Sequence, residues 1–307
     1  MLNSRRMKSR YVVAAAAALL VTSIAGATDA AGERADVERW QAKRLEHLTS
    51  DTGWLTLAGL FWLKDGTNTF GSAKSNALRL EHPALAPKAG TFEKSGSSVR
   101  FVANPKAGIT VAGKPATTVA LVPDTKDEPT VLESGPVSFF LIERDGRYGV
   151  RVRDQNNPHR VHFSGLQYFP ISNDWAFDAR FEPYAPRRHI PITNILGMEE
   201  NMDSPGALVF NKDGHEYRLD TVLEEPDATE LFVMFADGTS GKETYGAGRF
   251  LYLPLPVNGK VPLDFNKAYS PPCAFNDFAT CPLPPPQNRL GLRVEAGEKS
   301  YAGAHAP

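Results

Sequence analysis

Short runs in which apolar and polar residues alternate follow one another along most of the chain, and turn residues separate them. Because alternate side chains of a strand point to opposite faces, this pattern is typical of an all-β protein. It predicts strands at Trp54–Leu63, Ser98–Ala103, Thr117–Val122, Val137–Glu143, Tyr148–Arg153, Ala207–Phe210, Tyr217–Val222 and Leu231–Ala236. Asp-Gly pairs at 145–146, 213–214 and 237–238 predict turns between antiparallel neighbours, since both residue types accept positive φ.

One segment near the N-terminus has helical periodicity instead. Between Glu33 and Ser50 the apolar residues fall on a single stripe, and charged residues occupy the remaining positions. We therefore expect one N-terminal helix over residues 33–50, followed by mainly antiparallel sandwich or barrel modules.

The first residues have the pattern of a cleavable export signal. Basic residues up to Arg10 precede an apolar run from Tyr11 to Ile24 and the small-residue triplet Ala25–Ala27. A run of this length is shorter than the roughly 20 residues that cross a bilayer, so no stable membrane span is expected after cleavage. The pattern predicts a signal peptide over residues 1–27 and a periplasmic or extracellular location. An uncleaved N-terminal anchor is the alternative.

Composition and charge narrow the classes of partner. Hydrophobic residues make up 42% of the 307 residues and charged residues 22%, as in ordinary globular proteins. Without the four basic residues of the leader, 30 Lys and Arg face 35 Asp and Glu, a net charge of −5. Since this acidic body has no basic block, nucleic acid is not an expected partner.

The length favours two modules, and the composition indicates where they meet. We expect a first β module over 54–164, a junction rich in aromatic residues and proline over 165–188, and a second β module over 189–303. From Pro254 to Pro286 there are nine prolines in 33 residues, which excludes central strands and predicts an extended surface wrap.

The two cysteines of the chain, Cys273 and Cys281, lie within this proline-rich wrap. Because free thiols are uncommon in exported proteins, we expect a disulfide that closes the wrap. A redox or metal pair is the alternative, although seven intervening residues do not match the two-residue spacing of such motifs.

The densest collection of polar groups lies in the C-terminal third, and its members are the candidate catalytic residues: Glu243, Tyr245, Arg249, Asp264 and Asn266. Together they offer a carboxylate base, a phenol, a guanidinium and an amide, which suffice for proton transfer or for holding an anionic substrate. The competing structural interpretation is a buried salt bridge between Arg249 and an acid that fixes the wrap. No cofactor motif is found, and His159 and His162 are spaced to opposite faces of a strand, so no metal is expected.

The same region resembles a known family. The matching segments are Thr244–Leu251, Leu263–Tyr269, Pro271–Phe275, Cys281–Pro286 and Asn288–Leu290, with Gly53–Leu55 and Gly59–Leu63 upstream. On these segments the chain resembles, over nearly all of its mature length, the bacterial and archaeal domain-of-unknown-function family 1684. The resemblance implies no particular activity.

A second resemblance concerns the first module. The segments Asp65–Gly71 and Ser75–Leu80 are similar to the opening of forkhead-associated (FHA) β-sandwiches, which bind phosphothreonine peptides. Those domains carry an arginine directly after the glycine, where this chain has Ser72. The resemblance therefore implies a sandwich without the guanidinium that would hold phosphate.

Two functions remain open at this stage. The first is a non-enzymatic extracytoplasmic protein that binds an unknown small molecule or is associated with an envelope component. The second is a small-molecule hydrolase or isomerase, in which Glu243 or Asp264 would be the base and Arg249 would anchor an anionic substrate.

Overall fold

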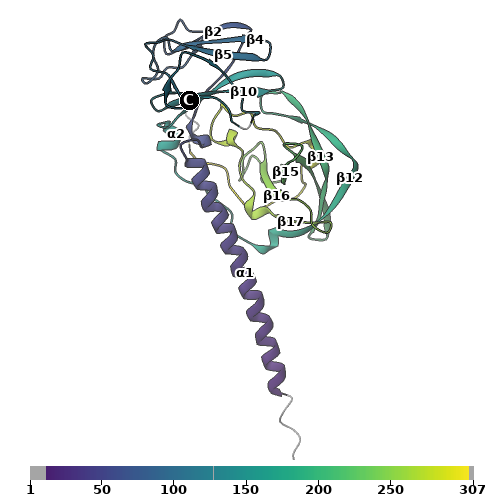
Figure 1. The fold of residues 1–307 in the computed structure, drawn as a ribbon. Helices are drawn as coiled ribbons and strands as arrows, with labels where there is room; N and C mark the ends of the chain where they lie inside the picture. The colour runs from purple at the N-terminus through teal and green to yellow at the C-terminus, as the bar shows by residue number, and fades with distance from the viewer. Residues whose placement is uncertain (1–11, 127, 304–307) are drawn as a thin grey trace, which may run out of the picture.

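The computed structural model describes residues 12–126 and 128–303, with the backbone alone for residues 12–30 (Figure 1). Helix α1 (Val12–Thr49) contains the predicted helix and begins well before it. Its first half extends away from the β modules in Figure 1. Part of the predicted leader lies outside the described residues. Among the described helices, none combines the length and the apolar character that crossing a membrane requires.

The first module is a β-sandwich. One sheet contains β1 (Leu57–Trp62), β11 (Arg147–Asp154), β10 (Val137–Arg144), β9 (Val131–Ser134), β6 (Thr110–Val111) and β7 (Lys114–Pro115), in that order. The other contains β3 (Leu78–Arg79), β2 (Gly66–Gly71), β4 (Gly90–Ser95), β5 (Ser98–Ala103) and β8 (Thr118–Ala120). Between the sheets, Phe70, Phe92, Phe101 and Phe139 form a cluster with contacting ring centroids 4.8–6.1 Å apart. The expected sandwich is thus present.

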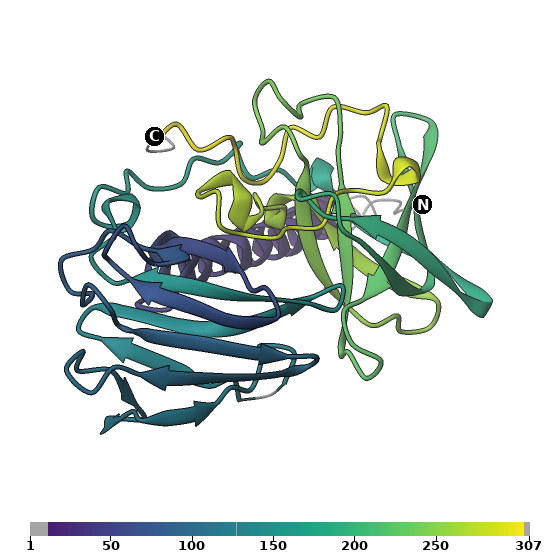
Figure 2. The same cartoon turned by 90° about the horizontal axis from the view of Figure 1, so that it is seen from above.

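The second module is one strongly curved, mainly antiparallel sheet. Its order is β16 (Arg249–Pro254), β15 (Glu230–Phe235), β14 (His215–Leu223), β13 (Glu199–Lys212), β12 (Ala176–Thr193) and β17 (Lys260–Asp264). The sheet curls into a nearly closed barrel around an apolar core that includes Phe235 and Phe265. Figure 2 shows the two modules side by side. The predicted fold class is confirmed: antiparallel β modules with an N-terminal helix.

A short helix and five 3₁₀ turns complete the described elements. They are α2 (Pro158–Val161), η1 (Trp54–Thr56), η2 (Asn173–Trp175), η3 (Phe265–Lys267), η4 (Pro272–Ala274) and η5 (Pro286–Asn288). The side chain of Asn157 caps the N-terminus of α2. His159 lies within the helix, and His162 is the residue that ends it. The position of α2 shows that the His159 segment is not a strand.

Two of the three Asp-Gly pairs form hairpin turns as predicted. Asp145 and Gly146 join β10 to β11, and Asp213 and Gly214 join β13 to β14, all with positive φ. The pair at 237–238 does not, because neither residue has positive φ and residues 236–248 separate β15 from β16. Asp237 instead uses its carboxylate to organise the loop, as described below.

The junction between the modules is shorter than the aromatic segment suggested. Residues 176–188 form the first part of β12, and only residues 155–175 connect the modules. Two prolines, at 183 and 186, are tolerated in β12 because the pairing with β13 shifts register between Pro183 and Arg188.

The proline-rich segment is exposed at residues 254–260, but most of its later part, from Pro271 to Pro285, is buried rather than wrapped over the surface. Cys273, Ala279 and Cys281 pack in an apolar cluster with Leu57 of β1 and Phe232 of β15. The segment therefore lies between the two modules and fills the seam that joins them, because both modules present apolar side chains to it. We call the segment 268–290, together with the apolar cluster that it completes, the seam.

Candidate functional site

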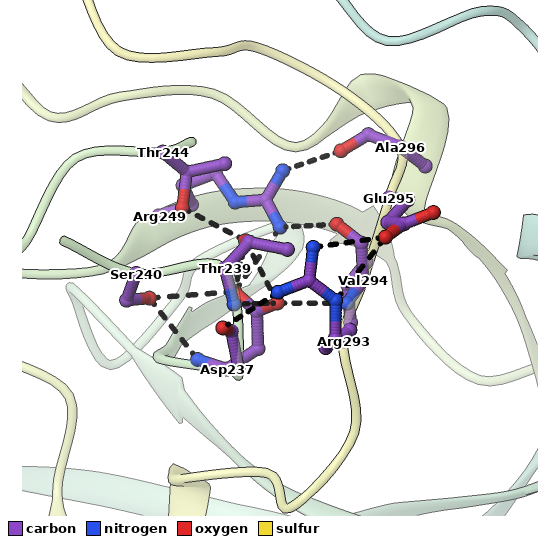
Figure 3. Close-up of polar contacts among 10 residues, drawn as sticks. Asp237, Thr239, Ser240, Thr244, Arg249, Arg293, Val294, Glu295 and Ala296 are labelled. Atoms are coloured by element: carbon purple, nitrogen blue, oxygen red, sulfur yellow. Dashed lines mark hydrogen bonds and ion pairs between the residues drawn. The ribbon is translucent and has the colours of Figure 1, made fainter. Parts of the chain in front are cut away.

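Arg249, the central candidate of the C-terminal third, is sealed inside the protein. It begins β16, and its side chain is 0% exposed. The guanidinium donates to Asp237 Oδ1 at 3.2 Å, to the carbonyl of Val294 at 2.9 Å and to the carbonyl of Ala296 (Figure 3). Burial lowers the pKa of Arg249, and the Asp237 carboxylate opposes that shift.

Asp237 completes this buried contact. Its second oxygen, Oδ2, accepts hydrogen bonds from the backbone N–H of Val294 at 2.7 Å and from that of Thr239 at 3.1 Å (Figure 3). The ion pair therefore connects the loop after β15 to the C-terminal segment 294–296. The structure contains the buried pair of the structural interpretation, but the pair fixes residues 294–296 rather than the proline-rich wrap.

The other four candidates lie in separate contacts. Glu243 pairs with the exposed Arg293 at 2.7 Å, and that hydrogen bond holds the pKa of Glu243 below its usual range. Tyr245 donates its hydroxyl to the carbonyl of Cys273 at 3.1 Å, and burial raises its pKa to about 12. A phenol with this pKa stays protonated at neutral pH.

Asp264 and Asn266 are occupied with local structure. Asp264 Oδ1 accepts the backbone N–H of Asn266 at 2.9 Å and thereby caps η3. Asn266 then forms two hydrogen bonds with the backbone of Ser172, at 2.9 and 3.1 Å. These contacts attach the inter-module connection to the second module. The candidate catalytic residues thus do not converge on one site.

The cysteines are adjacent but not bonded. Cys273 and Cys281 are free, buried thiols, and each backbone N–H donates to the sulfur of the other, at 3.1 and 3.4 Å. The expected disulfide is therefore absent from the structure. A hydrogen bond from Cys281 lowers the pKa of Cys273, whereas burial raises the pKa of Cys281. Both side chains pack as small residues within the apolar cluster of the seam.

A cleft of about 1270 Å³ lies next to the seam. Its lining includes α1 with the following residues 50–54, the β10–β11 hairpin with residues 124–125, and Arg151 of β11. It also includes the end of β12 with the beginning of β13, residues 224–225, and the seam with the neighbouring face of β15 and β16. Cavities of 300–1,000 Å³ hold typical small-molecule ligands, so this cleft has room for one. We call it the inter-module cleft.

Arg151 of β11 is the most deeply buried charge in the inter-module cleft. Its residue exposure is 2%, and burial lowers its pKa to about 10. Nη2 donates to Thr280 Oγ1 at 3.2 Å, and the guanidinium carbon lies 5.7 Å from the ring centroid of Trp54. Nε is buried without a partner. Within the described ranges, Arg151 forms no salt bridge.

Aromatic rings form an apolar wall of the same cleft. Phe232 stacks on Tyr252 at 4.8 Å, and Tyr252 stacks on Tyr269 at 6.4 Å between ring centroids. The Tyr252 hydroxyl donates to Glu224 at 2.7 Å. Desolvation raises the pKa of Glu224, and the neighbouring Glu225 and Glu200 raise it further. This side of the cleft therefore combines ring faces with acidic groups.

Helix α1 adds basic groups to the same cleft. Arg44 of α1 lies over the ring of Tyr269 at 4.6 Å and forms a salt bridge with Glu298 at 3.3 Å. Lys43 and His47 of the same helix also line the cleft. In the residues that the structure describes, no group of three His, Cys, Asp or Glu side chains is arranged to hold a metal ion.

Sequence reasoning placed Arg151 on a strand but did not identify it as a site residue. The signal was present: in 147–154, arginine alternates with small or apolar residues along a strand whose neighbours are strongly apolar. Arg151 and Arg153 share the face of the strand that points away from the core of the first module, and their charge indicates that this face does not pack in a purely apolar core. What it meets depends on the second module, which no local pattern describes.

The fold and these contacts define a two-module antiparallel β protein with an open cleft beside its seam. The chain belongs to the family described as a protein of unknown function, DUF1684, whose profile matches residues 161–299. An uncharacterised protein from Haloarcula marismortui, solved by NMR, is 32% identical, with a TM-score of 0.40, over 47% of this chain and 81% of its own.

Two solved FHA structures are also similar to part of the chain. One is the FHA domain of FhaA in complex with the intracellular domain of another protein, at 17% identity and a TM-score of 0.22 over 31% of this chain and 97% of that domain. The other comes from a study of phosphothreonine-dependent FHA interactions, at 16% identity and a TM-score of 0.22 over 31% and 92%. No curated protein sequence matches this chain.

Proposed function

We propose that this protein is an exported, non-enzymatic binding protein that holds a small molecule in the inter-module cleft. The observation that carries the proposal is the cleft itself, about 1270 Å³ in volume and lined by both modules and by α1. Its lining combines aromatic rings with many charged and polar side chains, so it can hold both an apolar and a charged part of a ligand. Export follows from the leader pattern of residues 1–27.

The alternative function, a hydrolase or isomerase in the C-terminal third, has weaker support. It requires Arg249 to act on one substrate together with either Glu243 or Asp264, and each of the three is engaged in a different contact. Arg249 is 0% exposed, so a substrate would have to open the protein to reach it. Binding in the cleft requires no such opening.

A substitution that fills the cleft tests the proposal. Asn201 is exposed and lines the cleft at the beginning of β13, whereas Asn211 is exposed near the other end of the same strand. Asn201→Trp should occupy the cleft, and Asn211→Trp is its matched control. A library of small aromatic and aliphatic acids, amides and amines is screened by thermal shift against both variants and the wild type.

The expected result is a set of compounds that stabilise the wild type and Asn211→Trp but not Asn201→Trp. A ligand at one hundred times its Kd stabilises by about 2.7 kcal/mol, and this corresponds to a rise in Tm of several degrees. Compounds that stabilise all three proteins equally would place binding elsewhere and would contradict the proposal. Mass spectrometry of compounds released from denatured, freshly purified protein provides an independent readout.

A further inference from the structure

The strand that carries Arg151 directs it away from the core of its own module. Val150 and Val152 are 0% exposed and pack inside the sandwich. Since alternate side chains of a strand point to opposite faces, Arg151 and Arg153 lie on the other face, toward the second module. The register of β11 between β1 and β10 fixes this direction, with Arg151 opposite Leu60 and Phe140.

In this position the Arg151 guanidinium is desolvated without being neutralised. Its hydrogen bond to Thr280 Oγ1 uses one donor of a group that has five, and Nε is buried without a partner. The acid that most affects it, Asp124, is already held by Arg144 through two hydrogen bonds of 2.9 and 2.8 Å. A buried cation without a counter-ion is strongly unfavourable, so the native fold retains a cost here that an anion would remove.

We propose that Arg151 binds the oxyanion, a carboxylate or a phosphate, of the ligand that occupies the inter-module cleft. The inference rests on the proposed function and specifies its ligand class. The planar fork of a guanidinium matches both oxyanions, which can accept two parallel hydrogen bonds from it. Thr280 Oγ1 lies 3.2 Å from Nη2 and orients the fork from the seam side.

The rest of the lining limits what the oxyanion is attached to. Phe232 and Tyr252 present an aromatic wall to the cleft, which suits an apolar or aromatic body. Glu199, Glu200 and Glu225 line the cleft as well and are exposed. They repel negative charge in their part of the cleft, whereas Lys43, Arg44 and Arg144 attract it in other parts. The ligand is therefore a molecule in which the oxyanion is attached to an apolar or aromatic body.

A matched residue on the same strand separates this role from a structural one. Arg153 lies on the same face of β11, its Nε is also buried without a partner, and burial lowers its pKa as well. Its guanidinium stacks on Phe140 at 4.7 Å, and it is not part of the lining of the cleft. Arg153→Met therefore removes a similar guanidinium without altering the cleft.

The test compares three probes that share a 3-phenylpropyl body: 4-phenylbutyrate, 3-phenylpropyl phosphate and the neutral 4-phenylbutyramide. Their dissociation constants are measured by calorimetry for the wild type, Arg151→Met, Arg153→Met and Asn201→Trp. We expect Arg151→Met to weaken binding of at least one oxyanion probe by about tenfold or more, because hydrogen bonds to charged groups are the strong ones. Binding of the amide should not change, and Arg153→Met should bind all probes as the wild type does.

The oxyanion probe with the lower dissociation constant shows whether the site prefers a carboxylate or a phosphate. Unchanged oxyanion binding in Arg151→Met, together with its loss in Asn201→Trp, would overturn the inference and leave the proposed function standing. No preference of the wild type for either oxyanion over the amide would also overturn it. Equal binding of every probe by the wild type and Asn201→Trp would instead contradict the proposed function.

The stability of the ligand-free variants gives a second readout. If Arg151 serves a ligand, replacing this unpaired charge by methionine should leave the Tm of the free protein unchanged or raise it, since function and stability oppose each other at such sites. A fall of several degrees in Arg151→Met, matched by no loss of oxyanion binding, would show that the guanidinium is a structural contact between the modules.

Discussion

Two buried guanidiniums on neighbouring modules differ in how they are satisfied. Arg249 faces a carboxylate and two backbone carbonyls, and these contacts offset the cost of its burial although its Nε, like that of Arg151, has no partner. Arg151 is buried nearly as deeply and has one neutral hydroxyl. A buried charge is stable only when an opposite charge or hydrogen bonds offset its lost hydration. We therefore assign Arg249 a structural role and propose that Arg151 is a binding group.

The contribution of Arg249 can be measured directly. Arg249→Met leaves Asp237 buried without its counter-ion and should lower the free energy of unfolding by about 3–5 kcal/mol. Arg293→Met is the control, because Arg293 pairs with Glu243 on the surface and should cost no more than about 1 kcal/mol. Urea denaturation measures both. Equal losses in the two variants would contradict the structural role of the buried pair.

Among the elements, α1 is attached to the body by one buried salt bridge as well as by apolar packing. Arg44 reaches Glu298, whose side chain is 0% exposed, and donates to the carbonyl of Ser270 at 2.9 Å. Leu48 of the same helix packs against Phe275. Through these contacts the helix forms one wall of the cleft and holds the C-terminal segment.

Removing Arg44 should give a pH-dependent loss of stability. Burial raises the pKa of Glu298, and Arg44 opposes that shift by favouring the ionised form. When the pKa of a carboxyl group is higher in the folded state than in the unfolded state, the folded protein loses stability as pH rises. For Glu298 this loss begins near the unfolded pKa, about 4.5, and continues through the folded pKa. In Arg44→Met that loss should increase.

The expected difference from the wild type is small below about pH 4.5, where Glu298 is protonated in both states, and about 3 kcal/mol at pH 7. Arg39→Met, on the exposed side of α1, serves as the control and should differ by less than about 0.5 kcal/mol at both pH values. Thermal unfolding at pH 4 and pH 7 measures the difference in stability between each variant and the wild type. A pH-independent effect of Arg44→Met would contradict the role of Glu298.

Elements with strong local patterns could be predicted from the sequence. The prediction of Ser98–Ala103 matches β5 at both ends, and β10 and β11 were located within one residue of their ends. β12 could not be predicted in full, because two of its prolines, Pro183 and Pro186, are tolerated through a register shift against β13. The partner of Arg249 and the seam could not be predicted either, since both depend on contacts between residues that are distant in the sequence.

At the scale of the whole molecule, the modules share an apolar cluster rather than a flexible linker. Leu57 of the first module is 0% exposed and packs with Ile192 and Phe232 of the second. The seam supplies Cys273 and Cys281 to the same cluster. The modules therefore form one unit, and the inter-module cleft keeps a defined shape.

We expect both modules to unfold in a single calorimetric transition. Leu57→Ala, in the shared cluster, and Leu141→Ala, inside the first sandwich, should each lower the stability by about 2–5 kcal/mol and shift the whole peak. Two resolved peaks in the wild type, or a shift of only part of the heat in Leu141→Ala, would show that the modules unfold independently.

The position of the seam in the sequence also affects how the protein is made. Tyr269 pairs with Phe250, Pro282 with Asn194 and Arg289 with Ala236, so the last part of the chain completes contacts along the second module. Until a ribosome has released these residues, the apolar faces around Leu57 and Phe232 have nothing to cover them. A nascent chain that stalls before residue 268 would consequently expose both faces, which makes it prone to aggregation and a substrate for chaperones.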